Sequence, residues 1–387
     1  MTPSGPARSG SVPHWPGVPS LAAREAVLLG PYAMHSAASA GREHEEQPHP
    51  YRGPFQRDRD RIVHSAAYRR LSYKTQVFTG ERGDYHRTRL THTHEVSSIA
   101  RTMARALRLN EDLVEALALL HDIGHPPFGH CGEDILNECL VNHGGFNHNQ
   151  QALRIVQLLE RRYHKFPGLN LSAEVLAGQT IRANKKQPLL TGQSPLLEVQ
   201  LVDAADSIAY DTHDADDALE LRLLTLDELL EIPLWSEAAE RVRERSAPLT
   251  PAELRLAVLH ELIEWQVGDL LERAGRQLAT GLYADVASVR RAPLLITPDP
   301  VLATKKRELE RFLFDKVYRH PTVVAEREEA ATALRAMFSG YQQRSDLLPT
   351  KFQQLARSQG LFRSIGDYIG GMTDRYALQE YERLFAH

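Results

Sequence analysis

Cysteine is scarce in this chain, which contains only Cys131 and Cys139. These two thiols fall eight residues apart on one predicted helix, too far to bridge within it, so neither a disulfide framework nor a cysteine-rich zinc site is expected. A reducing compartment fits this usage. No apolar run reaches membrane-spanning length, and the N-terminus lacks the charged-then-apolar pattern of a secretory signal. We therefore expect a cytoplasmic protein with no membrane segment.

Strand signals and excess charge are also sparse. Only residues 74–80 could form a short strand or hairpin, and strands do not alternate with helices anywhere. The formal net charge of -4 argues against a general polyanion binder, although a local basic pocket remains open. Aromatic and basic residues do not interleave, so nucleic-acid binding is not indicated.

The hydrophobic periodicity is that of helices, and it predicts an all-α fold with few or no strands. Residues 1–50 are rich in Pro, Gly, Ser and Ala and show no period, which favours a mobile or poorly ordered arm. An ordered arm docked on a neighbouring subunit is the alternative. Residues 51–225 form the expected helical core. We expect residues 226–387 to form a C-terminal helical region that completes the active-site pocket and the contacts between subunits.

Several helix starts are marked by capping residues. Asn110 and Asn147 each precede a periodic segment, and Thr250-Pro251-Ala252-Glu253 is a capping box. Ser194 with its following proline is expected to open a long helix that continues through Leu219.

The run 121–130 (HDIGHPPFGH) carries three imidazoles and a carboxylate at the end of a predicted helix. Eight of the 18 histidines lie between positions 86 and 148, and this density favours a site over scattered surface imidazoles. Imidazole nitrogen and carboxylate oxygen together suit a divalent cation of borderline hardness.

The helix from Ser194 carries a polar row that could face this site. Its members recur at steps of three or four and span an arc of about 100°; they are Asp203, Asp206, Tyr210, His213, Asp214 and Asp217. A solvated acidic face is the usual interpretation of such a row. The phenol within the row and the lack of compensating Lys or Arg weaken that interpretation.

In combination these motifs resemble the HD-domain superfamily of metal-dependent phosphohydrolases, and within it the deoxyguanosine triphosphate triphosphohydrolase (dGTPase) family. The resemblance covers most of the chain from about residue 50, with the motifs in the right order. They are residues 69–71 with 74–78, 89–92, 121–130 with 132–133, 144–149, 205–210 with 213–214, and 367–377.

The resemblance assigns the metal ligands to His92, His121, Asp122 and Asp206, with Asp203 as the alternative for the last. It implies a divalent cation, Mn²⁺ or Mg²⁺ first, with Fe²⁺ or Co²⁺ also suitable. It places four residues at the chemical step, namely His130 and Glu133 with His125 and His148. It places six at the substrate, namely Gln76, Arg89, Tyr210, Asp214, Tyr368 and Asp374.

Two positions depart from the family pattern. His94 stands where an apolar residue is usual, and Asn149 stands where some relatives have an acid. We expect His94 to be a packed imidazole, and we expect Asn149 to change the proton-transfer partner. Arg375 could either bind phosphate or brace the C-terminal helices.

The implied activity is hydrolysis of deoxynucleoside triphosphates, dGTP preferred, to deoxynucleoside and triphosphate. His130 could act as a general acid or as a nucleophile. The implied partners are the dNTP substrate, further copies of the chain in a homo-oligomer such as a hexamer, and an allosteric nucleotide. The alternatives are an HD phosphohydrolase of a cyclic dinucleotide, alarmone or monophosphate, and a non-catalytic nucleotide-binding HD protein.

Overall fold

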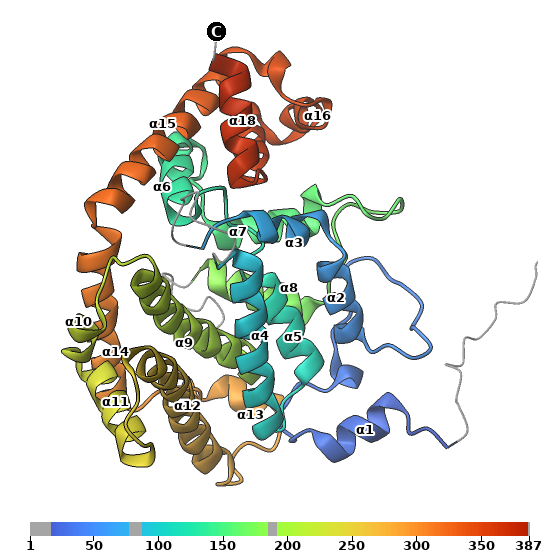
Figure 1. Cartoon of the computed structure of the whole chain (residues 1–387). Helices are drawn as coiled ribbons and strands as arrows, with labels where there is room; N and C mark the ends of the chain where they lie inside the picture. The colour runs from blue at the N-terminus through green and yellow to red at the C-terminus, as the bar shows by residue number, and fades with distance from the viewer. Residues whose placement is uncertain (1–16, 77–86, 185–191, 386–387) are drawn as a thin grey trace, which may run out of the picture.

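The computed structural model describes residues 17–76, 87–184 and 192–385. Within these ranges the chain forms 18 α-helices and no β-strand, with only isolated β-bridges such as the one between Thr75 and Thr88 (Figure 1). The all-α prediction is therefore confirmed. None of the described helices is both long and apolar enough to span a membrane.

The centre of the molecule is a group of helices that share one hydrophobic core. Buried apolar residues of α4, α5 and α9 form much of this core, and the three helices lie side by side in Figure 1. The helices of this region are α2 (Pro54–Val63), α3 (Ala66–Arg70), α4 (Arg89–Ala106), α5 (Glu111–Leu120), α7 (His148–Arg154), α8 (Ala173–Ala183) and α9 (Leu197–Glu220). The buried apolar residues of α6 (Gly129–Cys139) belong to a different cluster.

The described part of the expected mobile arm, residues 17–50, packs on this core, which differs from the prediction. It contains α1 (Leu21–Leu28), and the following Ala33 and Met34 are buried. The backbone N–H of Met34 donates to the buried carboxylate of Glu198 at 2.8 Å. A segment held by hydrogen bonds to distant carboxylates needs no amphipathic period, so the sequence pattern gave no sign of its packing.

The C-terminal half adds two further groups of helices, each with its own apolar cluster. The first group packs beside α9, and the second covers α6 through α15 and α17. In Figure 1, α15 runs along one side of the molecule from the first group to the second. These helices are α10 (Leu226–Leu230), α11 (Pro233–Arg245), α12 (Pro251–Leu278), α13 (Val286–Arg291), α14 (Pro300–Leu313), α15 (Pro321–Gln343), α16 (Thr350–Gln359), α17 (Leu361–Gly370) and α18 (Asp374–Phe385).

The predicted helix starts are confirmed at three of four places. The side chains of Asn110, Asn147 and Thr250 accept hydrogen bonds from the first turns of α5, α7 and α12. The expectation for Ser194 is wrong: α9 begins at Leu197, and the Ser194 hydroxyl donates to the carbonyl of Ala292 at 2.5 Å instead. The Ser194 side chain thus bonds to a carbonyl distant in the sequence and does not cap the helix next to it.

The predicted strand or hairpin at 74–80 lies only partly within the described residues. A 3₁₀ turn spans Leu71–Tyr73, and Thr75 forms a single antiparallel bridge with Thr88. Residues 77–80 lie outside the described part of the chain.

Candidate functional site

Three core helices place a histidine and aspartate set around one point. His92 lies near the start of α4, His121 directly follows α5, and Asp206 lies in the middle of α9. One ligand atom from each lies within 4.8 Å of the other two. Asp206 Oδ1 is 3.3 Å from His92 Nε2 and 3.5 Å from His121 Nε2, and Asp122 Oδ1 is 3.4 Å from His121 Nε2. Three of the four predicted metal ligands, His92, His121 and Asp206, therefore lie together, and Asp122 adjoins them through His121.

The imidazole of His121 is oriented to bind a cation. Its Nδ1 lies 2.6 Å from the carbonyl oxygen of Ala118 and donates to it, which leaves the lone pair on Nε2. That Nε2 is buried and has no hydrogen-bond partner among the described residues. Burial lowers the pKa of His121, so the ring is neutral near pH 7. An orphaned buried acceptor beside two carboxylates fits a divalent cation.

Both carboxylates of this cluster stay ionised. Burial alone would raise the pKa of Asp122 and Asp206, but nearby positive groups hold both well below their ordinary values. One of these groups is Arg89, whose guanidinium donates to Asp122 Oδ2 at 2.9 Å and to the carbonyl of Gln76 at 3.2 Å. Arg89 is itself buried. Arg89, which the resemblance assigns to phosphate, thus holds the carboxylate of Asp122, a predicted metal ligand, in place.

A second cluster lies beside the first and contains His125, His130, Glu133 and His148. Glu133 accepts from Nδ1 of His148 at 2.8 Å and lies 3.3 Å from Nδ1 of His130. Burial would raise the pKa of Glu133, but its bonds with the two imidazoles hold it far below the ordinary value. The side chain of His130 is 51% exposed, which makes it the most open member of this cluster.

His125 joins the two clusters. Its Nδ1 lies 3.1 Å from Asp122 Oδ1, and its ring stacks on that of His148 with centroids 3.9 Å apart. The buried ammonium of Lys74 donates to the carbonyl of His125 at 2.5 Å and to that of Gly370 at 3.1 Å. The loop between α5 and α6 is thereby tied to the C-terminal helices.

A pair of tyrosines lies on the other side of the site. Tyr210 on α9 and Tyr318 share a hydrogen bond of 2.6 Å, and the Tyr318 hydroxyl also donates to Asp214. Burial raises the pKa of Asp214 to about 7. The side-chain oxygen of Gln76 is buried without a partner among the described residues, and Gln76 lines a small cavity with His130 and Tyr318.

Comparison with known proteins agrees with this geometry. The HD domain model matches residues 89–211, and the model of the phosphohydrolase-associated domain matches residues 296–383. A deoxyguanosinetriphosphate triphosphohydrolase-like protein of Ralstonia pickettii (strain 12J) is 43% identical over 367 residues, covering 92% of this chain and 95% of its own. Proteins of the same description from Azoarcus sp. (strain BH72) and Geobacter metallireducens are both 44% identical, over 94% and 92% of this chain and 98% and 95% of their own.

The chain belongs to the dGTP triphosphohydrolase-like family of HD proteins. It is thus a phosphohydrolase of a metal-dependent class, and both matched regions contribute to the surroundings of its two clusters.

Two of the predicted substrate residues of this HD protein lie on the C-terminal helices, Tyr368 on α17 and Asp374 at the start of α18. Asp374 accepts from the backbone N–H of Thr75 and from that of Phe128, each at 2.9 Å. It therefore fixes the segments that precede Gln76 and His130. Tyr368 instead lines a separate cavity, between α3 and α16–α18.

The two departures from the family pattern have local partners. His94 is exposed, so the expectation of a packed imidazole is wrong, and its Nε2 lies 3.2 Å from the Tyr68 hydroxyl. The amide of Asn149 lies 2.8 Å from Nε2 of His148, and Gln179 donates to the Asn149 side chain at 3.0 Å. Asn149 therefore orients His148 through a hydrogen bond.

The sequence analysis missed two side chains of the HD site. Tyr318 ends a π-helical turn, Phe314–Tyr318, which nothing in the local sequence marks. Arg182 at the end of α8 is buried and donates to Asp206 Oδ2 at 2.6 Å and to Asp203. Because Asp203 is engaged by Arg182 outside the histidine pair, the geometry favours Asp206 over Asp203 as the ligand.

Arg182→Lys should weaken metal binding by about 10- to 100-fold, the range typical when a group that orients a ligand is replaced. Lysine keeps the positive charge, but its single ammonium group cannot bind Asp203 and Asp206 at once as the two guanidinium nitrogens do. The change therefore tests the orientation of Asp206 while the local charge stays the same. Titration of metal-free protein with Mn²⁺ measures the effect. Arg276→Lys, in an exposed pair on α12, is the matched control. Equal affinities in the two variants would contradict the role given to Arg182.

Proposed function

We propose that this protein hydrolyses deoxynucleoside triphosphates, dGTP in preference to the others, to deoxynucleoside and inorganic triphosphate. The main support is the contact between a cation-binding cluster and a proton-transfer cluster through His125. Phosphoryl chemistry needs both, because charge must be neutralised on the phosphates and the leaving oxygen must receive a proton. The names of the relatives point to the same reaction.

His92, His121, Asp122 and Asp206 would hold the cation, Mn²⁺ or Mg²⁺. When bound, it would supply charge neutralisation and an acidified water. The mixed nitrogen and oxygen donors with a solvent-facing side suit a catalytic site with open positions rather than a closed structural one.

His130 is the proposed general acid. The carboxylate of Glu133 lies 3.3 Å from its Nδ1 and would fix the orientation of the ring. In the proposed reaction water adds to the phosphorus nearest the sugar and the bond from that phosphorus to the 5′ oxygen breaks. The leaving oxygen takes the proton from His130. Glu133 also holds His148, so one carboxylate orients both rings.

The tyrosine pair is proposed to exclude a 2′-hydroxyl. Tyr210 and Tyr318 bond to each other and to Asp214, so their hydroxyls are already engaged. A ribose hydroxyl placed against them could donate to a phenol oxygen but would find no O–H group to accept from, so it would lose part of its hydration at a cost of about 1–3 kcal/mol. Gln76, whose buried side-chain oxygen has no partner among the described residues, is the proposed acceptor for a sugar hydroxyl.

The test is incubation of the full chain with each of the four dNTPs and with GTP, in Mn²⁺ or Mg²⁺, with products identified by mass. Deoxyguanosine and triphosphate are expected from dGTP, at the highest rate of the set and with little product from GTP. A chelated sample is the control. Release of pyrophosphate or inorganic phosphate would favour another HD phosphohydrolase, and absence of turnover would favour a nucleotide-binding protein. A homo-oligomer and an activating nucleotide stay predictions.

A further inference from the structure

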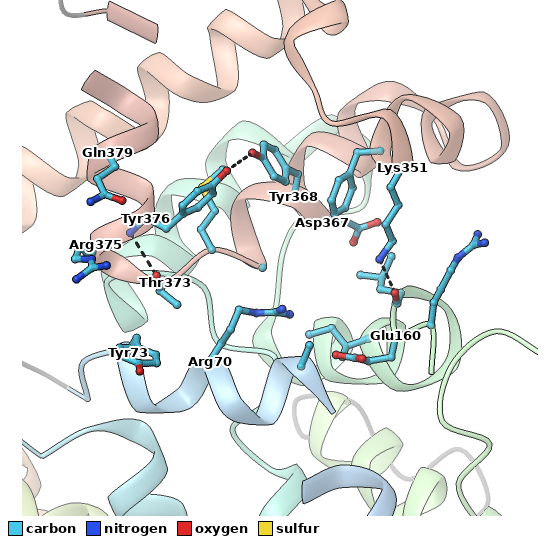
Figure 2. Close-up of a pocket in the computed structure, with 17 residues that line it drawn as sticks. Arg70, Tyr73, Glu160, Lys351, Asp367, Tyr368, Thr373, Arg375, Tyr376 and Gln379 are labelled. Carbon is cyan, nitrogen blue, oxygen red and sulfur yellow. Dashed lines mark hydrogen bonds between the residues drawn. The ribbon is translucent and has the colours of Figure 1, made fainter. Parts of the chain in front are cut away.

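An arginine of the associated region lines the small cavity beside the second cluster. Arg327 on α15 borders this cavity together with Gln76 and His130. Among the described residues, the cavity shares no lining residue with the larger one between α3 and α16–α18, which Figure 2 shows. Arg327 therefore belongs to the surroundings of the two clusters, although it lies far from both in the sequence.

The backbone of Arg327 is held at a fixed place relative to His130. The thiol of Cys131, the next residue after His130, donates to the carbonyl oxygen of Arg327 at 3.3 Å. The helices that carry these residues, α6 and α15, pack against each other through one buried apolar cluster. A side chain on packed helices is positioned more precisely than one on a loop, so Arg327 suits a contact that depends on geometry.

The contacts of the Arg327 guanidinium in the described part of the chain are with neutral groups. Its Nη1 donates to the carbonyl oxygen of Tyr318 at 3.4 Å, and its Cζ lies 5.6 Å from the centroid of the Tyr318 ring. Arg335 on the same helix differs, because it forms an ion pair with Glu138 at 2.7 Å. A guanidinium has more N–H donors than the long bond to Tyr318 uses, so Arg327 can donate to a ligand.

The proposed position of the substrate decides which part of it Arg327 can reach. The proposed function places the phosphates at the metal ligands and the sugar against Gln76 and the tyrosine pair. The base is then the part nearest to Arg327, because the guanidinium lies over the ring of Tyr318 and borders the same cavity as Gln76. The cavity has a volume of about 20 Å³, which holds one water molecule and no ring, so an edge of the base rather than its face would approach Arg327.

We propose that Arg327 makes this site prefer guanine to adenine by donating a pair of hydrogen bonds to O6 and N7 of the base. The inference rests on the proposed function and gives a physical reason for its preference for dGTP. O6 and N7 are neighbouring acceptors on one edge of guanine, and the fork of an arginine matches their spacing. Adenine has an amino group in place of O6, which would face an N–H donor, so one of the two bonds is lost.

Equilibrium binding of dGTP and dATP to the full chain carrying His130→Ala, loaded with Mn²⁺, tests the proposal. This variant should keep the metal without consuming the nucleotide. We expect dGTP to bind about 10- to 100-fold more tightly than dATP, the range for a good bidentate contact, and this preference to disappear when Arg327→Met is added. Methionine keeps an unbranched apolar chain but has no donor. Arg335→Met, at an exposed arginine of the same helix, is the matched control and should leave the preference unchanged.

Two analogues of dGTP separate this contact from a general change in the pocket. The 7-deaza analogue lacks the N7 acceptor and should bind about tenfold more weakly than dGTP, but only while Arg327 is present. Deoxyinosine triphosphate keeps O6 and N7 and lacks only the 2-amino group, so it should bind as dGTP does.

The proposal is overturned by any of these results: no preference of the His130→Ala protein for dGTP, the same preference after Arg327→Met, equal losses of dGTP and dATP affinity in that variant, or an equal loss of preference in Arg335→Met. Equal losses for both bases would indicate a contact to the phosphates or the sugar instead. None of these readouts depends on turnover, so failure of dNTP hydrolysis leaves the inference to be judged on binding. Hydrolysis of dGTP with unchanged selectivity in Arg327→Met would keep the proposed function and remove only this inference.

Discussion

His121→Ala should abolish both metal retention and turnover, whereas His130→Ala should retain the metal and lose only turnover. His121 supplies the unpartnered Nε2 that faces the two carboxylates, so its loss removes a ligand. The loss in turnover should be at least about 10³-fold, since charge neutralisation on the phosphates is worth several kcal/mol. His130 lies in the neighbouring cluster with Glu133, and loss of a general acid should cost about 10²- to 10⁴-fold.

Metal content by mass spectrometry and steady-state rates on dGTP distinguish the two variants. His143→Ala is the matched control, because this exposed histidine stacks on Phe362 outside both clusters. It should keep wild-type metal content and rate. A His130→Ala protein that turns over normally would remove this residue from the mechanism, and a fully metallated His121→Ala protein would show that the cation binds elsewhere.

Gly124→Ala should lower both stability and turnover, although it adds a single methyl group. A Cβ at Gly124 would lie 2.0 Å from the carbonyl oxygen of His148 and 2.4 Å from the amide nitrogen of Ala152. Both are backbone atoms of α7, so the helix itself must move. Overpacking of this kind costs about 1–3 kcal/mol or more. Because His148 begins that helix, its bond with Glu133 should be disturbed as well.

Gly268→Ala provides a control of opposite sign. Gly268 lies in the interior of α12, and a Cβ there would meet nothing within 4 Å. Alanine should raise the free energy of unfolding by about 0.5–1 kcal/mol at such a position. Urea unfolding and dGTP turnover of the two variants provide the measurements. Equal stability of Gly124→Ala and the wild type would show that α7 can shift to accommodate the added methyl group at little cost.

The features that the sequence predicted well depend on interactions between residues close to one another in the chain. A cap such as Asn110 depends on a side chain and backbone N–H groups within three residues, so the pattern is visible in the chain. The predicted cap at Ser194 was wrong because its hydroxyl donates to the carbonyl of a residue 98 positions away in the sequence. Arg182 and Tyr318 have no local signature either, since their partners lie on α9 and only the tertiary fold brings them there.

The site residues divide in the same way. The histidines of 121–130 were visible as a cluster because they lie within ten residues of one another. Tyr368 and Asp374 were assigned to the substrate through the resemblance. The structure places the former at the second cavity and the latter on backbone N–H groups, at distances that only packed helices define.

Lys74 connects the two regions that the family models match. Its ammonium is buried between a carbonyl of the HD region and one of the associated region. A chain that ended before residue 296 would leave this buried donor short of an acceptor, at a cost of about 1–3 kcal/mol. We therefore expect that replacing the associated region with an unrelated one would destabilise the HD region unless the replacement supplied an acceptor in the place of Gly370.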